Sequence, residues 1–71
     1  MNYIVIEAQT TEDTTATIVN TYTDRAKAES KFHSILAAAA DSSVEKHGAV
    51  LMTEECITLR NECYTHVEEA E

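Results

Sequence analysis

Hydrophobic and polar residues alternate with a period of two in the first third of the chain. Residues 3–9 read YIVIEAQ, and residues 15–23 read TATIVNTYT. Alternation of this kind, with many β-branched residues, predicts two β-strands. The polar residues 10–14 between them predict a hairpin. We expect its loop to be long, because it lacks the Asn-Gly or Gly-Gly pair of a tight two-residue turn.

The period then changes to that of a helix. Apolar residues recur every three or four positions, at Ala28, Phe32, Ile35, Leu36 and Ala39. This spacing predicts an amphipathic helix with one buried stripe. Thr23 is the expected N-cap, and the helix is expected to end between Asp41 and Ser43.

Two further strands are predicted after the helix. Residues 49–53, AVLMT, are apolar on both sides, and residues 57–67, ITLRNECYTHV, alternate again. Residues 45–48 and 54–56 are expected to turn the chain, the first with Gly48 at a positive φ. The order strand, strand, helix, strand, strand predicts a single α+β domain over residues 1–67. One helix would cover one face of a four-stranded sheet in a two-layer sandwich, followed by a disordered acidic tail over residues 68–71.

The two faces of this sheet are predicted to differ in what covers them. The helix is expected to cover Ile4, Ile6, Ile18, Leu51, Ile57 and Leu59, with Ile18 and Leu36 in the core. The opposite face would then carry Tyr3, Val5, Thr17, Val19, Val50, Met52 and Tyr64. A patch that is half apolar and aromatic indicates an interaction site, and so small a domain gains stability from a partner.

We therefore predict a homo-oligomer, most simply a dimer, formed through this open sheet face. The partner-binding candidates are Tyr3, Val5, Val19, Met52 and Tyr64. Ala37, Ala38 and Ala40 cannot all face the sheet. They either lie bare at the surface, which alanine tolerates as the best helix former, or pack against a second chain.

The charge is strongly acidic, with thirteen acids, five bases and a net charge of −8. Affinity for nucleic acids and for anionic membranes depends on lysine and arginine, so both are disfavoured as partners. A basic protein partner is allowed. The N-terminus lacks the basic start and cleavage site of a signal peptide, and no apolar run approaches the length of a membrane span. We expect a cytoplasmic location.

Most of the positive charge falls in the first half of the predicted helix. Arg25, Lys27, Lys31 and His33 lie there, near a helix N-terminus with free N–H groups. This clustering suggests a site for a small anion or nucleotide. The plainer interpretation is a solvated basic face that balances nearby acids.

Recognisable catalytic motifs are absent from the sequence. It has no phosphate-binding loop, nucleophile elbow or H-E-x-x-H pattern, so we predict neither an enzyme nor a cofactor. Cys63 could meet His33 or His47, and Cys63 with His66 makes half of a metal site without a second pair. On one extended strand Cys56 and Cys63 would lie roughly 23 Å apart, beyond the about 7 Å limit of a disulfide. Both are expected to be buried and reduced.

Several segments together resemble a known family. They are YIVIE.Q (3–9), Y.DR..AESK.H..LAAAA.SSV (22–44), H.AV (47–50) and ECY (62–64). The chain is similar over nearly its whole length to small uncharacterised proteins encoded by gut Clostridia and their prophages, most specifically in the helix. The resemblance implies a phage or prophage origin without a mechanism.

Together these features predict a small acidic, non-enzymatic binding protein, such as an inhibitor of a host defence factor. One alternative is an oligomer that sequesters a small anionic or nucleotide ligand. Another is a structural accessory protein of a phage particle.

Overall fold

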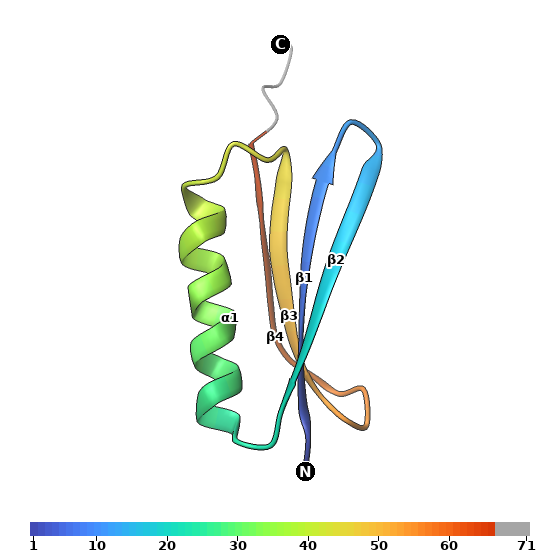
Figure 1. Cartoon of the computed structure of the whole chain (residues 1–71), viewed down its shortest axis with the longest axis vertical. Coiled ribbons are helices and arrows are strands. Elements are labelled where there is room, and N and C mark those ends of the chain that lie inside the picture. The colour runs from blue at the N-terminus through green and yellow to red at the C-terminus, as the bar shows by residue number, and fades with distance from the viewer. Residues whose placement is uncertain (67–71) are drawn as a thin grey trace.

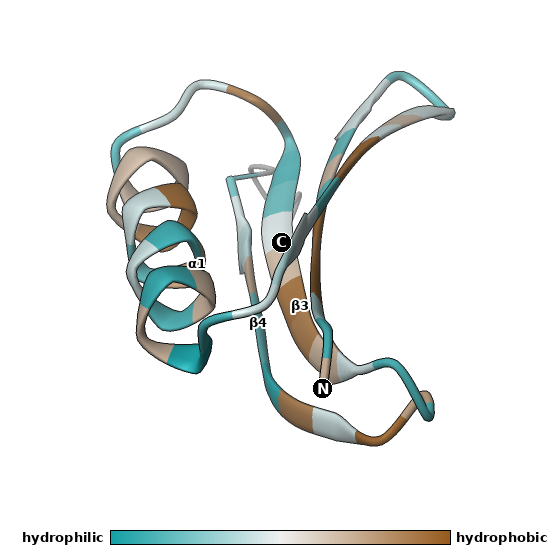
Figure 2. Cartoon of the chain, turned by 60° about the horizontal axis from the view of Figure 1, so that its bottom comes forward, coloured by the Kyte–Doolittle hydropathy of each residue, from teal (hydrophilic) through white to brown (hydrophobic). Residues whose placement is uncertain are grey.

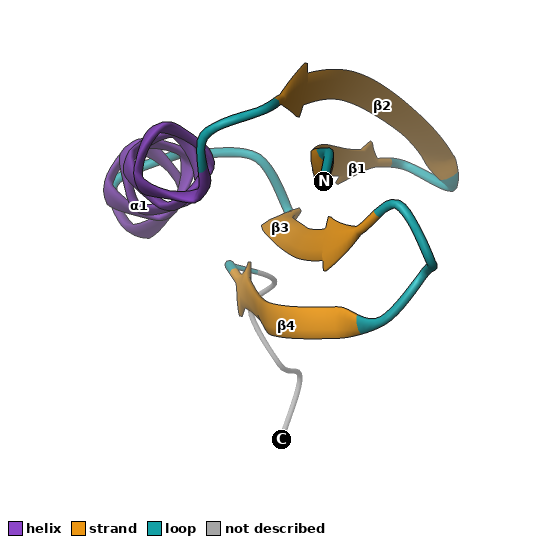
Figure 3. Cartoon of the chain, turned by 90° about the horizontal axis from the view of Figure 1, so that it is seen from below, coloured by secondary structure: helices purple, strands orange, loops and turns teal. Residues whose placement is uncertain are grey.

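A single helix packs on one face of a four-stranded sheet in the computed structural model, which describes residues 1–66 (Figures 1 and 3). The elements are β1 (Tyr3–Thr11), β2 (Thr14–Tyr22), α1 (Arg25–Ala40), β3 (Lys46–Thr53) and β4 (Thr58–Thr65). The strands lie in the order β2-β1-β3-β4, and every neighbouring pair is antiparallel. The predicted α+β class and element order are confirmed. The predicted tail, residues 68–71, and Val67 lie outside the described residues.

The core lies between α1 and the two central strands. Val5 of β1 and Leu51 of β3 stand opposite each other in the ladder, and both are fully buried. The helix contributes Ala28, Phe32, Ile35 and Ala39, all buried. Leu36 is partly buried against this cluster. The helical stripe was therefore predicted correctly, and the small side chains of Ala28 and Ala39 let the helix approach the sheet closely.

The predicted orientation of β1 is wrong. Val5 faces the helix, whereas Ile4 and Ile6 alternate with it and face away. Both sides of this strand are apolar at its start, so alternation alone does not orient it, and its polar residues Glu7 and Gln9 come later. These two lie on the helix side all the same, because His47 of β3 supplies a partner for Glu7 there.

Two other residues expected in the core are exposed. Ile18, on the helix side of β2, has 51% of its surface exposed, because α1 does not reach over this edge strand. Ile57 is 56% exposed and precedes β4. The other two expected residues, Leu51 and Leu59, do contribute to the core, Leu59 at its margin.

The β1–β2 hairpin is tighter than expected. Thr11 pairs directly with Thr14, so the connection consists of Glu12 and Asp13 alone. Both residues have positive φ, 51° and 69°, as a type I′ turn requires. The hairpin thus takes the tight geometry without the glycine that usually signals it.

Two boundaries differ from the prediction, the start of α1 and the start of β3. Asp24, one residue after Thr23, caps α1, and its Oδ1 accepts a hydrogen bond of 2.9 Å from the backbone N–H of Ala26. The helix ends at Ala40, close to the expected point. β3 begins already at Lys46, so residues 45–48 do not form a turn and Gly48 has no positive φ.

Gly48 is needed for a different reason. It lies opposite Cys63 of β4, and a Cβ at this position would stand 2.5 Å from the carbonyl oxygen of Glu62. Any residue other than glycine at this position would therefore push β4 away from β3.

Of the four consecutive alanines, only Ala39 is buried, and Ala37, Ala38 and Ala40 are exposed. In the single chain, this favours the alternative in which these three alanines lie bare at the surface. Within the described residues, no helix is both long and apolar enough to cross a lipid bilayer.

Candidate functional site

The sheet face opposite α1, here called the outer face, is covered by no helix or strand of the described residues. Alternation and register assign its side chains: Ile4, Ile6, Ala8 and Thr10 of β1; Thr15, Thr17, Val19 and Thr21 of β2; Lys46, Gly48, Val50 and Met52 of β3; and Thr58, Asn61, Cys63 and Thr65 of β4. Lys46 is the only charged residue among them. In Figure 2 the hydrophobic colour runs along the middle of β3, whereas the first turns of α1 are mostly hydrophilic.

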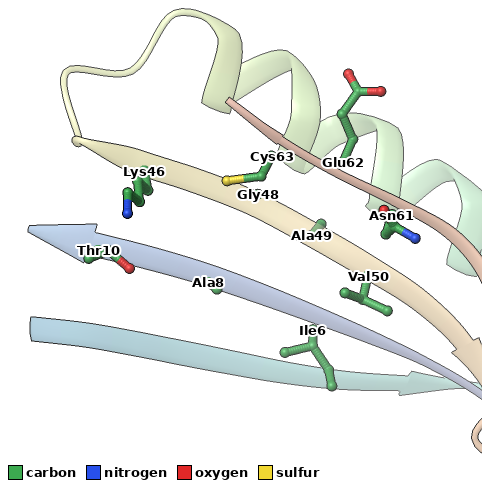
Figure 4. A pocket seen from close by; sticks show the side chains of 10 residues that line it. All are labelled: Ile6, Ala8, Thr10, Lys46, Gly48, Ala49, Val50, Asn61, Glu62 and Cys63. Carbon is green, nitrogen blue, oxygen red and sulfur yellow. The ribbon is translucent and has the colours of Figure 1, made fainter. Parts of the chain in front are cut away.

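A shallow groove of about 410 Å³ crosses the outer face over β1, β3 and β4 (Figure 4). Ala8 and Gly48 make it hollow because they are small, and Ile6 and Val50 flank it. Its polar margin comes from Thr10, Lys46 and Asn61. Ala49 and Glu62 border the groove with their backbone, since their side chains alternate toward the helix side.

The groove contains few ionisable side chains. Among the side chains on the outer face, only Lys46 and Cys63 are ionisable, and neither forms a hydrogen bond or ion pair with a side chain of the described residues. An apolar floor with a few polar groups at the margin is typical of a ligand or protein contact.

A polar pair lies on the other side of the sheet, beneath α1. His47 Nε2 lies 2.6 Å from Glu7 Oε2, and Gln9 Nε2 donates to the same oxygen at 3.0 Å. The side chains of His47 and Glu7 are only 6% and 13% exposed. Burial raises the pKa of Glu7, but the hydrogen bonds from His47 and Gln9 and the nearby positive charges outweigh it, so its pKa lies below the usual value.

The Glu7–His47 pair serves the fold. The second ring nitrogen of His47, Nδ1, is buried and has no hydrogen-bond partner among the described residues. The other nitrogen, Nε2, contacts Glu7, and the whole side chain is only 6% exposed. The pair therefore joins β1 to β3 under the helix.

The residues predicted to bind an anion do not converge. Glu29 accepts hydrogen bonds from Arg25 at 3.2 Å and from Arg60 of β4 at 2.6 Å. His33 Nε2 lies 3.7 Å from the same carboxylate. The hydrogen bond from Arg60 is the main reason that the pKa of Glu29 is lowered.

Lys27 and Lys31 lie on another side of the helix. At 100° per residue, they are rotated by about 160° from Glu29 around the helix axis. The four residues predicted to bind an anion are thus divided between two sides of α1. Two of them, Arg25 and His33, already lie beside the acid Glu29.

A β-bulge explains how Arg60 reaches Glu29. The register of β3 and β4 shifts between Leu51 and Met52, so that Leu59 and Arg60 are together accommodated opposite Leu51. Leu59 packs at the core margin, and Arg60 extends to α1.

The predicted partner-binding set is divided between the two faces. Val19 and Met52 lie on the outer face as expected. Tyr3, Val5 and Tyr64 lie on the helix side, and Val5 is completely buried. The inverted orientation of β1 also means that the analysis of the sequence missed Ile4, Ile6 and Ala8. A period of two alone cannot say which side of a strand faces the core.

The cysteines and remaining histidines do not form a site in the described part of the chain. Cys56 and Cys63 are both free and exposed, contrary to the expected burial, and Cys56 lies in a turn with a φ of 66°. Cys63 is on the outer face and His47 on the helix side, so they cannot pair.

His66 stacks on Tyr64 with ring centroids 6.4 Å apart, and its Nε2 lies 2.8 Å from the carbonyl oxygen of Ala39. No group of three His, Cys, Asp or Glu residues within residues 1–66 could hold a metal ion.

Comparison with known protein families, curated proteins and solved structures finds no match for this chain.

Proposed function

We propose that this chain is a small acidic, non-enzymatic binding protein and that the outer face of its sheet is the binding surface. The observation that carries the proposal is the distribution of charge. Lys46 is the only charged residue on the outer face, in a chain with thirteen acids and five bases. A solvated sheet face is usually polar, and depletion of charge marks the centre of protein interfaces.

The size of the outer face supports a macromolecular partner. Four strands about 4.8 Å apart and eight residues long, at about 3.3 Å per residue, span on the order of 500 Å² in projection. Contact over this area would bury at least about 1,000 Å² from both partners, which is the lower end for a specific interface. The acids elsewhere on the surface would steer a basic partner toward the molecule and orient it.

The nature of the partner is proposed from the resemblance to prophage-encoded proteins. That resemblance supports a bacterial host protein, such as a defence factor, as the target, and the host cytoplasm as the place of action. Sequestration of an anion is less well supported, because Glu29 already occupies Arg25 and lies close to His33.

Site-specific photocrosslinking in bacteria that produce the chain tests the binding surface. A photoreactive amino acid replaces Asn61, which is exposed on the outer face next to the groove. The matched control carries the same group at Ala37, which is exposed on α1. We expect protein adducts from position 61 and few from position 37. Equal yields at both positions, or none at position 61, would contradict the proposal.

A further inference from the structure

β2 is an unprotected sheet edge. It is nine residues long, TTATIVNTY, and contains no charged residue and no proline. Its register with β1 is continuous over its whole length, without a bulge. Proteins usually block such edges with charges, proline or bulges, because an open edge pairs with other strands. The opposite edge, β4, has two of these devices: a register shift near Leu51 and the charged residues Arg60 and Glu62.

Both faces of β2 are also uncovered. Ile18 on the helix side is 51% exposed, and Val19 on the outer side is 58% exposed. Of the β2 side chains, Tyr22 at the end of the strand packs against the core. The helix packs mainly on the central strands β3 and β1, so it leaves the edge of β2 and most of its side chains uncovered (Figure 3).

We infer that β2 is a strand-pairing site and that its occupant is β2 of a second copy of this chain. Antiparallel pairing would join two four-stranded sheets into one continuous sheet of eight strands. This inference goes beyond the proposed function, since it uses the edge of the sheet instead of its outer face. It also extends that face, because the outer faces of the two copies would become continuous.

The sequence of β2 is suited to pairing with itself. Full overlap of residues 14–22 places Ile18, the middle residue, opposite Ile18 of the second copy. Thr17 then pairs with Val19, and Thr15 with Thr21, on the outer side. Cross-strand pairs of threonine and of β-branched residues stabilise antiparallel sheets. No pair in this register contains a charge.

Charge limits where two copies can meet. Two chains of net charge −8 repel each other over most of their surfaces, but β2 is neutral along its whole length. In the antiparallel register, the hairpin residues Glu12 and Asp13 lie opposite Asp24 and Thr23 of the other copy, and Arg25 and Lys27 follow in the first turn of α1.

A charge exchange at position 18 tests both the pairing and its register. Ile18→Lys and Ile18→Glu change a side chain that is half exposed and lies opposite Glu7 of β1, so circular dichroism first verifies that each variant folds. Sedimentation equilibrium should give twice 7.9 kDa for the natural chain and 7.9 kDa for each variant alone. In the paired sheet, two lysines or two glutamates would face each other across the two-fold axis. An equimolar mixture of the variants should restore the dimer, because lysine then faces glutamate.

Ile57→Lys is the matched control, since it makes the same substitution at an isoleucine that is 56% exposed and precedes β4, the opposite edge of the sheet. We expect it to leave the dimer intact. A natural chain that stays at 7.9 kDa at millimolar concentration overturns the inference, as does a dimer that survives Ile18→Lys or a mixture that stays monomeric. Failure here leaves the crosslinking result at position 61 unaffected, so the two proposals fail separately.

Discussion

Replacing His47 by alanine should destabilise the fold, because it removes the main partner of a nearly buried carboxylate. The His47 and Glu7 side chains are 6% and 13% exposed, and their nearest atoms lie 2.6 Å apart. In His47→Ala, only Gln9 continues to donate to Glu7. Loss of a hydrogen bond to a charged group costs about 1.5–3 kcal/mol. We expect about 3 kcal/mol, the upper end of this range, because the carboxylate that loses its partner is nearly buried.

That cost is a large share of the total stability. At about 0.05–0.15 kcal/mol per residue, a chain of 71 residues has a free energy of unfolding of about 4–11 kcal/mol. In a domain of this size each kcal/mol shifts the midpoint by about 4–8 °C, so the melting temperature of His47→Ala should fall by about 12–24 °C. Thermal and urea unfolding followed by circular dichroism measure both quantities.

His33→Ala is the matched histidine control. Its side chain is 62% exposed and lies 3.7 Å from Glu29, and exposed substitutions of this kind usually change stability by no more than about 0.5 kcal/mol. A double-mutant cycle with Glu7→Ala then isolates the contact between Glu7 and His47. We expect the double variant to lose about 0.5–3 kcal/mol less than the two single losses combined. Additive losses, or a His47→Ala effect as small as that of His33→Ala, would refute the reasoning.

The same pair should make stability depend on pH in the acid range. The pKa of Glu7 is lower in the folded chain than its ordinary value of 4.5. Its contribution is therefore fully present above about pH 4.5 and is lost as the pH falls through the lower folded-state value. Melting temperatures measured from about pH 6 to about pH 3 should fall more steeply for the natural chain than for Glu7→Gln. Parallel curves for the two proteins would show that Glu7 does not contribute to the pH dependence of stability.

Three further substitutions and one reaction test other parts of the structure. Leu51→Ala should cost about 2–5 kcal/mol because Leu51 is fully buried, whereas Ile18→Ala should cost far less in the same thermal assay because half of Ile18 is already exposed. Gly48→Ala should cost about 1–3 kcal/mol in urea unfolding, since its Cβ would lie 2.7 Å from the Cα of Cys63. Cys56 and Cys63 are exposed and free, so mass spectrometry should find both alkylated in the native protein without a reductant; protection of either thiol would contradict its exposure.

The order of elements was predictable because the hydrophobic period changes sharply at the start of α1. Ala28, Phe32 and Ile35 can share one side only in a helix, and all three are buried. The orientation of β1 was not predictable in the same way. Ile4 and Val5 have similar hydrophobicity, so only a contact distant in sequence, between Glu7 and His47, places the polar side of this strand under the helix.

The tight hairpin and the role of Gly48 were missed for related reasons. Glu12 and Asp13 adopt positive φ without glycine, because continuous pairing of β1 with β2 up to Thr11 and Thr14 leaves only two residues for the turn. Gly48 is explained by a neighbour on another strand, since the carbonyl oxygen of Glu62 occupies the space of its Cβ. Sequence patterns describe local preferences, whereas both features depend on pairing between strands.

The size of α1 explains why the open surfaces of the candidate site exist at all. A helix of sixteen residues is about 24 Å long and about 10 Å wide, so it covers on the order of 240 Å². One face of the sheet spans on the order of 500 Å², and a single helix therefore leaves β2 and the entire outer face uncovered. If water were the permanent neighbour of these surfaces, the many charged residues of this chain would be expected there. Instead, β2 has no charged residue and the outer face has only Lys46. Charged residues are therefore fewest on the sheet surfaces that α1 leaves open. This distribution is expected of surfaces that bind another protein molecule.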